Sequence, residues 1–589
     1  MSNSLFRRKP IHSILHDKSA AEEHQHLGLS RVLTVRDLTF FGIAAIIGAG
    51  SFSSLGGAVF SGGPGIVILF IICGIACAFT AFCYAEFASR IPVAGSAYTY
   101  AYASFGELFA WIIGWALLME YSIGNIYVAF SWSDYFTSFL QKINIYLPDY
   151  LTTSYPEAKK AVAEGSVNQE LINAWNTAPL AGGLKMIFDL PALIINILIT
   201  ILVYRGIKES RNFSNVMVVL KLAAVALVIL VGGALIFSND LTANWRPLNE
   251  TGIRSFMPNG FGGVMAAVSG VFFAYIGFDA VSVLAEESKN PQRDLPKGMI
   301  LSLVICTIAY ILLALVLTGA VHYGKFDGIG DPLAFIFEPQ NLNVGWMQFL
   351  IAIIAVVAMT SVLLVFQMGQ PRIWMSMSRD GLLPNSFQKI HPKYKTPSFS
   401  TIVTGLIVGI PILFTDKTFV LDFTSIGTLF AFVLVCGGVL LIPRRENQPG
   451  KFNMPYVNAK FVYPLLIFGS IAFIALFSNR YFTELFNGDF SNYSEVANSK
   501  DYLFQLPAVK ISTMIFWLIC VGLAVYCFFK NFSLIPLLGL TSCLYLLTGM
   551  SASNWKWFFI WFAIGVIVYF MYGYKNSKLH KESVASAGA

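Results

Sequence analysis

Charged residues are scarce in this chain. Only 12% of its 589 residues are Asp, Glu, Lys or Arg, whereas 56% are apolar and the mean hydropathy is +0.66. A soluble chain of this length would expose too much hydrocarbon to stay dispersed in water. The composition therefore excludes an ordinary soluble protein and indicates one that lies in a lipid bilayer.

Cysteine and histidine form no metal-binding or disulfide pattern. All eight cysteines lie in apolar stretches, and the only close histidine pair, His24 and His26, lies in a polar tail. We expect the cysteines to behave as small hydrophobic residues, and we expect no metal and no cofactor. The first 37 residues also lack the apolar core of a cleavable signal, so the first membrane helix should direct insertion.

The sequence also lacks the motifs of the main alternative classes. A membrane enzyme would place His, Asp or metal-ligand clusters at a membrane face, and the chain has no such cluster, no phosphate-binding loop and no nucleophile elbow. A channel would favour repeated pore loops or rings of charge, which are also absent from the sequence. We therefore expect neither an enzyme nor a channel.

Long apolar stretches dominate the rest of the chain. Each is long enough to span about 30 Å of hydrocarbon as a helix. The stretches are 39–60, 64–88, 106–137, 188–205, 213–237, 261–285, 299–323, 345–377, 398–415, 421–442, 461–478, 510–529, 532–549 and 555–573. The sequence thus predicts an all-α integral membrane protein of about fourteen transmembrane helices. Two polar insertions, 138–187 and 479–509, should form surface loops with some helix.

The distribution of Lys and Arg predicts the orientation. With the N-terminus inside, 26 of the 39 Lys and Arg residues fall on the inner side and 12 on the outer side. Cytoplasmic loops carry the excess of positive charge, so both termini should be cytoplasmic in the cell (plasma or inner) membrane. The net charge of +7 then reflects topology rather than a nucleic-acid partner.

Two of the predicted spans contain an interruption. The first has Gly48 and Gly50 at its centre, and the sixth has Gly277 beside the charged Asp279. Glycine lowers helix propensity by about 1 kcal/mol relative to alanine. The two spans stand five helices apart, a spacing typical of an inverted repeat whose halves each open with an interrupted helix. Close packing of small residues is the alternative interpretation of the glycines.

An interruption at this depth has a chemical consequence. Unwinding frees backbone N–H and C=O groups that lipid cannot satisfy, so these groups must face water, an ion or a substrate. Helix N-termini suit a carboxylate, and freed carbonyls suit an ammonium group. Together the two interruptions, near 46–53 and 273–279, suit the zwitterionic backbone of an amino acid.

Five motifs resemble one known family. They are similar to the cationic amino acid transporter branch of the amino acid–polyamine–organocation superfamily over about residues 30–480. The motifs are "IIGAGSF", "GIKESRNFSNVMVVLK", "FFAYIGFDAVSVLAEESKNPQRDLPKG", "GQPRIWMSMSRDGLLP" and "SIGTLFAFVLVCGGVLLIPRR". The resemblance implies a LeuT-type fold of two inverted five-helix repeats, with the last spans as the extension of fourteen-helix members.

The resemblance also implies roles for individual positions. The substrate carboxylate should meet the backbone amides of Gly48, Ala49, Gly50 and Ser51. The substrate amino group should meet the backbone carbonyls of Ile46, Phe273, Ala274 and Ile276. The ring of Phe273 would act as a thin gate. The family usually has an aliphatic residue where this chain has Ser51, which a backbone contact tolerates.

Lys221 lies deep in the fifth predicted span. It stands eight residues into the span, which is about 12 Å along a helix. A lysine facing lipid at this depth would cost at least a few kcal/mol, so we expect it to point into the bundle; the alternative is a stem that reaches the inner headgroups. In transporters of this fold a lysine here replaces a sodium ion between spans one and eight, which implies coupling to protons.

Four further residues are expected at or beside the site. Glu120 in the third span should line the substrate pocket or pair within the bundle. Asp279 and Gly277 should be structural, with the carboxylate satisfying backbone groups at the interruption. Phe366 in the eighth span matches the position that, by the family resemblance, helps to set the depth of the pocket. A bulky ring there favours small or medium neutral amino acids over cationic ones drawn by Glu120.

The sequence thus predicts three parts and one activity. A cytoplasmic tail, 1–37, precedes a transport core, 38–442, and a C-terminal extension of about four helices, 443–589. The predicted activity is secondary active, proton-coupled uptake of neutral L-amino acids by alternating access. A transporter or exchanger of cationic amino acids or polyamines, and a sensor that binds amino acids without moving them, stay open as alternatives. The sequence says nothing of an accessory subunit.

Overall fold

The computed structural model of the chain describes residues 5, 7–10, 33–91, 96–164, 168–205, 211–248, 252–286, 288–394, 396–443, 451–490, 504 and 506–581. Most of the predicted tail, 1–37, and most of 491–509 lie outside the described residues, as do His24 and His26. Every statement below concerns the described residues.

Helices make up almost all of the described structure, because long apolar runs can satisfy their backbone only internally once they leave water. The only named strands among the described residues are β1 (Leu180–Ala181) and β2 (Leu184–Lys185), which form an antiparallel hairpin. The helices of the first half are α2 (Val35–Ile46), α3 (Leu55–Gly62), α4 (Ile66–Arg90), α5 (Ser96–Ser104), α6 (Glu107–Lys142), α7 (Tyr155–Glu164), α8 (Gln169–Thr177), α9 (Leu190–Arg205), α10 (Arg211–Ser238), α11 (Gly260–Ala266) and α12 (Val268–Phe273). The helices of the second half are α13 (Pro291–Ala320), α14 (Pro332–Phe335), α15 (Gly345–Arg379), α16 (Ser398–Ile412), α17 (Lys417–Leu441), α18 (Ala459–Phe477), α19 (Asn479–Phe486), α20 (Pro507–Phe529), α21 (Leu534–Leu547), α22 (Ala552–Val568) and α23 (Tyr574–Asn576).

Many of these helices can cross a bilayer. Within the described residues, nine helical runs are long and apolar enough, and a tenth consists of Gly260–Ala266 and Val268–Ser282, which meet at a bend of 43°. Helices α9, α16 and α21 are apolar but have only 10–17 residues. One of the nine runs, Gly50–Arg90, joins two predicted spans, which a turn at Gly63 (φ +57°) separates into α3 and α4. The chain is therefore a multi-pass membrane protein, and each predicted stretch is occupied by helix.

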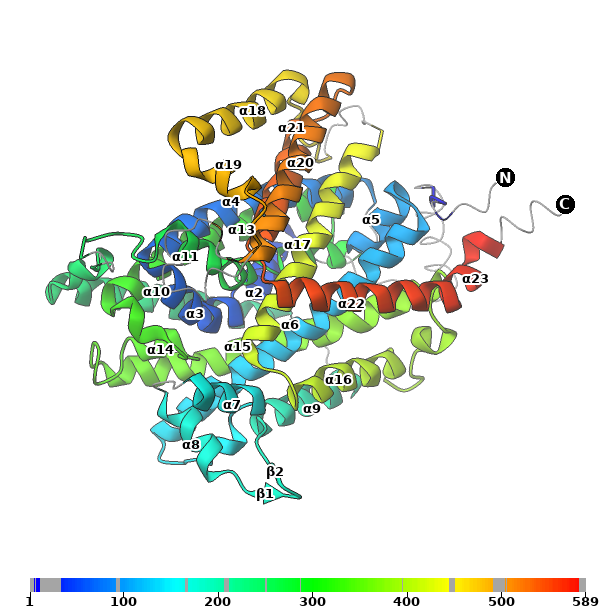
Figure 1. Cartoon of the computed structure of the whole chain (residues 1–589). Coiled ribbons are helices and arrows are strands. Elements are labelled where there is room, and N and C mark those ends of the chain that lie inside the picture. The colour runs from blue at the N-terminus through cyan, green and yellow to red at the C-terminus, as the bar shows by residue number, and fades with distance from the viewer. Residues whose placement is uncertain are drawn as a thin grey trace.

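The longest helices form the scaffold around the site. Figure 1 shows that α6, α15 and α22 run side by side across the molecule and that α17 crosses them. Buried amides join α6 to α15: the amide nitrogen of Gln370 donates to the Ser122 hydroxyl at 2.5 Å, and Asn125 donates to Gln367. Because buried polar groups must be paired inside the protein, these bonds fix how α6 and α15 sit against each other.

The C-terminal helices divide between two hydrophobic cores. Residues of α21 and α22 join the main core, and the indole nitrogen of Trp111 in α6 donates to the Gly565 carbonyl in α22 at 2.8 Å. Helices α18 and α20 contribute to a second, smaller core that includes Tyr463 and Cys520 and that Leu537 of α21 also joins. Helix α21 therefore packs in both cores and connects them.

The two ends of the described chain meet at Glu107, a fully buried residue at the start of α6. The Glu107 carboxylate accepts hydrogen bonds from the hydroxyls of Ser577 (2.5 Å) and Tyr569 (2.9 Å), and Arg7 lies 3.6 Å from it. Arg7 also lies 2.7 Å from Nδ1 of His580. Glu107 therefore links the N-terminal segment to the C-terminal end.

The insertion 138–187 forms a small helical unit. Helices α7 and α8 pack around a separate core of Ala158, Ala174 and Ile187, and the β1–β2 hairpin follows α8 in the chain. Figure 1 shows this unit at one edge of the molecule, beside α9. Its Glu157 carboxylate accepts a hydrogen bond from the backbone amide of Lys417 at 3.1 Å, so the unit is attached to the start of α17.

Candidate substrate-binding site

The first helix is interrupted after Ile46. Ile47 adopts an extended conformation (φ −77°, ψ 95°), and regular winding resumes in a π-helical turn, Gly50–Ser54. Gly48 and Gly50 let neighbouring residues pack closely against the first interruption, because neither has a Cβ. A Cβ on Gly48 would lie 2.6 Å from Cγ2 of Val362, and a Cβ on Gly50 would lie 2.5 Å from Cα of Ala274.

The second interruption faces the first. Helix α12 ends at Phe273, residues 274–277 form turns, and a 3₁₀ helix follows at Phe278–Glu286. Gly277 has φ +114°, a conformation that favours glycine, and a Cβ there would lie 3.0 Å from the carbonyl of Ala45. The Asp279 carboxylate interacts with the backbone amides of Gly277 and Ala280, so it satisfies groups that the interruption frees.

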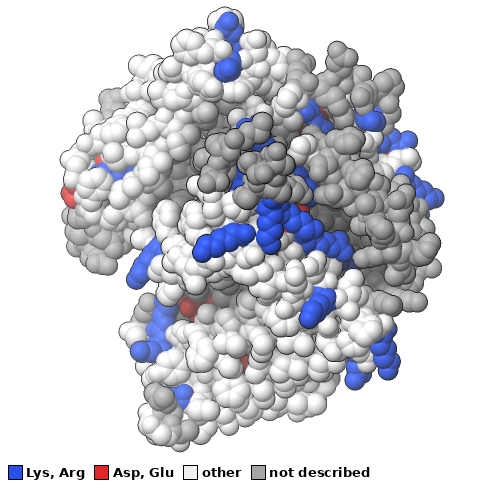
Figure 2. Space-filling model, turned by 90° about the vertical axis from the view of Figure 1, so that its right-hand side faces the viewer, with Lys and Arg blue, Asp and Glu red and all other residues white. Residues whose placement is uncertain are grey.

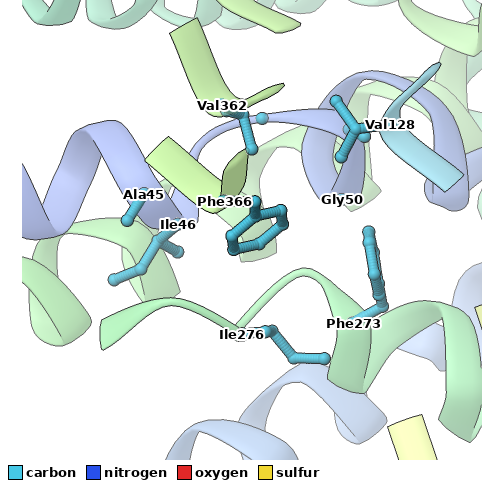
Figure 3. A pocket seen from close by; sticks show the side chains of 10 residues that line it. Ala45, Ile46, Gly50, Val128, Phe273, Ile276, Val362 and Phe366 are labelled. Carbon is cyan, nitrogen blue, oxygen red and sulfur yellow. The ribbon is translucent and has the colours of Figure 1, made fainter. Parts of the chain in front are cut away.

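A cavity of about 10 Å³ lies between the two interruptions. Figure 3 shows the Phe366 ring between the two interrupted segments, with Val362 and Phe273 beside it. The residues that line the cavity are Ala45, Ile46, Gly48, Ala49, Gly50, Val128, Phe273, Ile276, Val362 and Phe366. This volume holds about one water molecule. An amino acid can therefore enter only after the lining side chains move.

Most of the predicted site residues meet at this cavity. The exceptions are Ser51, Ala274 and Glu120, which do not line it. The Ser51 hydroxyl donates to the Gly48 carbonyl at 3.0 Å, so this side chain braces the interruption from within. The Ala274 backbone packs directly against Gly50, because a Cβ on Gly50 would lie 2.5 Å from Cα of Ala274.

Glu120 is not among the residues that line this small cavity. It lies eight residues before Val128 on α6, about 12 Å away along the helix axis. Its side chain is 3% exposed and therefore buried among the helices. Both predicted roles of Glu120, lining the substrate pocket and pairing within the bundle, stay predictions.

Tyr310 of α13 is part of the site, and the sequence did not indicate it. Its hydroxyl donates a hydrogen bond to the carbonyl of Ile46 at 3.0 Å, which occupies one of the carbonyls predicted to receive the substrate amino group. This role could not be predicted from the sequence, because Tyr310 is one of 25 tyrosines and lies in an unbroken apolar run. Ala45, Val128 and Val362 were missed for the same reason, since each is an ordinary residue of an apolar helix.

Lys221 points into the bundle. It is 1% exposed on α10, and its Nζ donates to the carbonyl of Ala44 at 3.0 Å. Ala44 lies two residues before the end of α2. The Lys221 side chain therefore binds the last turn of α2, just before the first interruption.

Aromatic and charged side chains cover the cavity on the side of the α7–α8 unit. The ring of Phe273 meets the ring of Tyr127 edge to face, with centroids 4.6 Å apart. Nζ of Lys417 lies 5.6 Å from the centre of the Tyr127 ring and forms an ion pair with Asp134 of α6. The Tyr127 ring thus packs on Phe273, and the Lys417–Asp134 ion pair lies on Tyr127.

Together the membrane helices and the two facing interruptions define a membrane protein built like a transporter. The model of the amino acid permease family matches residues 33–498, and a model of the C-terminus of amino acid permeases matches 532–577. The chain therefore belongs to the amino acid permease family.

Proteins similar to the chain carry several names. A branched-chain amino acid permease of Bacillus subtilis is 36% identical over 581 residues, which cover 99% of this chain and 100% of that one. A methylthioribose transporter of the same organism is 34% identical, with 98% and 100% covered. Vacuolar cationic amino acid transporter 2 of Arabidopsis thaliana is 31% identical, with 98% and 93% covered.

Proposed function

We propose that this protein takes up small or medium neutral L-amino acids, coupled to protons, by alternating access. The observation that carries the proposal is the cavity between two interrupted helices, lined only by apolar side chains and backbone. Membership of the amino acid permease family supports an amino acid as the substrate.

The backbone would bind the amino and carboxyl groups that all amino acids share. In the proposed site the amides of Gly48, Ala49 and Gly50 meet the carboxylate, and the carbonyls of Phe273 and Ala274 meet the ammonium group. The Ser51 amide donates to the Gly48 carbonyl at 3.1 Å. It would have to leave that carbonyl to join the carboxylate site.

The residues that line the cavity favour a substrate with a neutral side chain. Val128, Ile276, Val362 and Phe366 surround the part of the cavity beyond the backbone groups. A cationic side chain would lose its hydration there without an ionic partner among the residues that line the cavity. A relative named for branched-chain amino acids agrees with this ranking, whereas a relative named for cationic ones keeps the alternative open.

Uptake into proteoliposomes tests the substrate class. Labelled alanine is offered to the purified full chain, with unlabelled serine, leucine or arginine as competitor. We expect saturable uptake that serine and leucine inhibit at least ten-fold more strongly than arginine. Strong competition by arginine would make the cationic alternative correct. Saturable binding without uptake would make the protein a sensor.

Lys221 is the proposed site of proton coupling. Protonated Lys221 holds the carbonyl of Ala44, and deprotonation would release the helix turn before the interruption. In Lys221→Ala, we expect an imposed pH gradient to drive no accumulation. Lys510→Met is the matched control, since Lys510 is also a buried lysine (3% exposed) but is bonded to Asn487 and Asp489 far from the cavity. Accumulation in Lys221→Ala at the wild-type level would exclude this role.

The proposed architecture is the inverted repeat of two five-helix units with about fourteen spans. It comprises the tail 1–37, the core 38–442 and the extension 443–589. Figure 2 shows the face that carries α5 and α23, and Lys and Arg gather there while Asp and Glu are sparse. The positive-inside rule then supports cytoplasmic termini in the cell membrane. Protease accessibility of tags at the two ends tests this orientation.

A further inference from the structure

The ring of Phe366 lies between the two interrupted segments (Figure 3), where it is 5% exposed and lines the cavity. Since the cavity holds about one water molecule, a substrate side chain needs room that this ring occupies. The groups on which the ring packs therefore decide how far it can withdraw from the cavity.

Gly124 of α6 lies against the Phe366 ring but does not line the cavity. A Cβ on Gly124 would lie 3.3 Å from Cε2 of Phe366 and 3.6 Å from the Cγ2 methyl group of Thr424 in α17. The Tyr121 ring of α6 meets the Phe366 ring edge to face, with centroids 5.5 Å apart. The ring thus packs on the bare backbone of α6 at Gly124. We call Gly124, Tyr121 and Thr424 the side-chain recess.

The side-chain recess is apolar where it meets the ring. The Thr424 hydroxyl donates to the carbonyl of Val420 at 2.9 Å, and its methyl group is the part nearest to Gly124. An apolar surface of this kind accepts an aromatic edge without leaving a polar group unpaired. The ring of Phe366 can therefore move further into the recess at little cost in hydrogen bonding.

Hydrogen bonds fix the spacing of α6 and α15 at the level of the recess. The amide nitrogen of Gln370 donates to the Ser122 hydroxyl at 2.5 Å, and Asn125 donates to Gln367. All four residues are buried, and parting the helices would leave their polar groups without partners. The ring therefore gains room from the missing side chain of the recess glycine rather than from a separation of the two helices.

We propose that Gly124 is a positioning residue that sets the size of the accepted amino acid, because it lets the Phe366 ring withdraw into the side-chain recess. The inference rests on the proposed function and names branched aliphatic amino acids, such as leucine, among the substrates. A methyl group at position 124 would hold the ring in the cavity, since protein interiors are close-packed. Alanine would then still fit, whereas leucine would not.

Uptake of labelled alanine and leucine into proteoliposomes tests the inference. We expect the wild type to take up both amino acids. We expect Gly124→Ala to raise the KM for leucine by about ten-fold or more and the KM for alanine by less than about two-fold, a discrimination typical of a change of one carbon in an apolar pocket. A merely structural role would move both KM values alike, and an equal change in the two would overturn the inference.

Phe366→Leu tests whether the effect of Gly124 passes through the ring. The leucine side chain ends at its Cδ atoms and lacks Cε2, the ring atom nearest to the added Cβ. In the Phe366→Leu background, we expect Gly124→Ala to change the KM for leucine by less than about two-fold. A ten-fold change in that background would overturn the inference, because Gly124 would then act without the ring.

Gly437→Ala is the matched control. A Cβ on Gly437 of α17 would also meet a phenylalanine ring, 3.5 Å from Cζ of Phe105, but neither residue lines the cavity. We expect the wild-type ratio of the two KM values in this variant. A change of that ratio as large as in Gly124→Ala would overturn the inference.

Thr424→Ser keeps the test valid if Gly124→Ala does not fold, which size-exclusion elution shows. It keeps the hydroxyl and removes the methyl group of the recess, so we expect the ratio of the KM for leucine to the KM for alanine to fall by about two-fold or more. An unmoved ratio, or a wild type that takes up alanine but not leucine, would overturn the inference. If the wild type shows no saturable uptake of either amino acid, the proposed function fails and the inference falls with it.

Discussion

The hydroxyl of Tyr310 lies 3.0 Å from the carbonyl oxygen of Ile46, so a side chain of α13 binds the last residue of α2 before the first interruption. The Tyr275 hydroxyl makes a similar bond, at 2.8 Å, to the carbonyl of Phe70 in the uninterrupted helix α4. The two tyrosine rings meet edge to face, with centroids 5.6 Å apart. These residues thus form a natural pair for comparison.

Tyr310→Phe should weaken substrate binding. A buried hydrogen bond contributes about 1 kcal/mol net, so we expect KM to rise about five-fold as the first interruption loses its support. Tyr275→Phe is the control and should change KM by less than about two-fold. Equal effects in the two variants would mean that the bond to Ile46 has no special role.

Gly48→Ala should abolish most uptake. The added Cβ would lie 2.6 Å from Cγ2 of Val362, and overpacking of this kind costs about 1–3 kcal/mol. We expect at least a ten-fold fall in the uptake rate. Combining the change with Val362→Ala removes the clashing methyl group and should restore uptake to within about three-fold of Val362→Ala alone.

Gly57→Ala is the control for that pair, since a Cβ on Gly57 meets no atom within 4 Å. We expect its uptake rate to match the wild type. If the double variant stays as inactive as Gly48→Ala, Gly48 is needed for its backbone conformation rather than for space.

The ion pair between Lys417 and Asp134 should act through its opposite charges rather than through the identity of either residue. We expect Asp134→Lys or Lys417→Asp alone to lower the uptake rate about ten-fold, because each leaves two like charges over Tyr127. The double exchange should recover to within about three-fold of the wild type. As a control, exchanging Arg480 with Glu484, an i,i+4 pair with Arg480 63% exposed, should change uptake by less than two-fold. An inactive double exchange would contradict this account.

Asp331 should make stability depend on pH. It lies in the loop before α14, where burial, and next the charge of Glu338, raise the pKa of its carboxyl group from 3.8 to about 8. The folded state therefore binds the Asp331 proton more tightly than the unfolded state does, so this stabilisation is present at low pH and is lost as the pH rises toward 8. In detergent, we expect Tm to fall by a few degrees between pH 5 and 9 and to fall less in Asp331→Asn. An equal fall in both proteins would show that other groups are responsible.

The helices and the two interruptions could be predicted because their causes are local. Gly48, Gly50 and Gly277 mark the places where winding stops, and the apolar runs mark the spans. The inward direction of Lys221 followed from the cost of a charge in lipid. The positions of single residues around the cavity depend on partners far along the chain, such as Val362 opposite Gly48, and no local pattern contains them.

The position of Glu120 shows the same limit. A carboxylate in the middle of α6 could face any of its neighbours, and its surroundings depend on the packing of segments far along the chain. In the C-terminal extension, α21 contributes to both hydrophobic cores, whereas α18 and α20 contribute to the smaller one. The apolar residues of these helices do not differ in kind, so no local pattern predicts this arrangement.

The meeting of two distant described segments at Glu107 has a practical consequence. Arg7 and Ser577 both contact that carboxylate, so a short peptide could join the segments that carry them. The polypeptide could then be reopened within the α7–α8 unit, giving a circular permutant that keeps every helix around the cavity. Conversely, a bulky group inserted directly beside Arg7 or Ser577 would press on the same buried carboxylate.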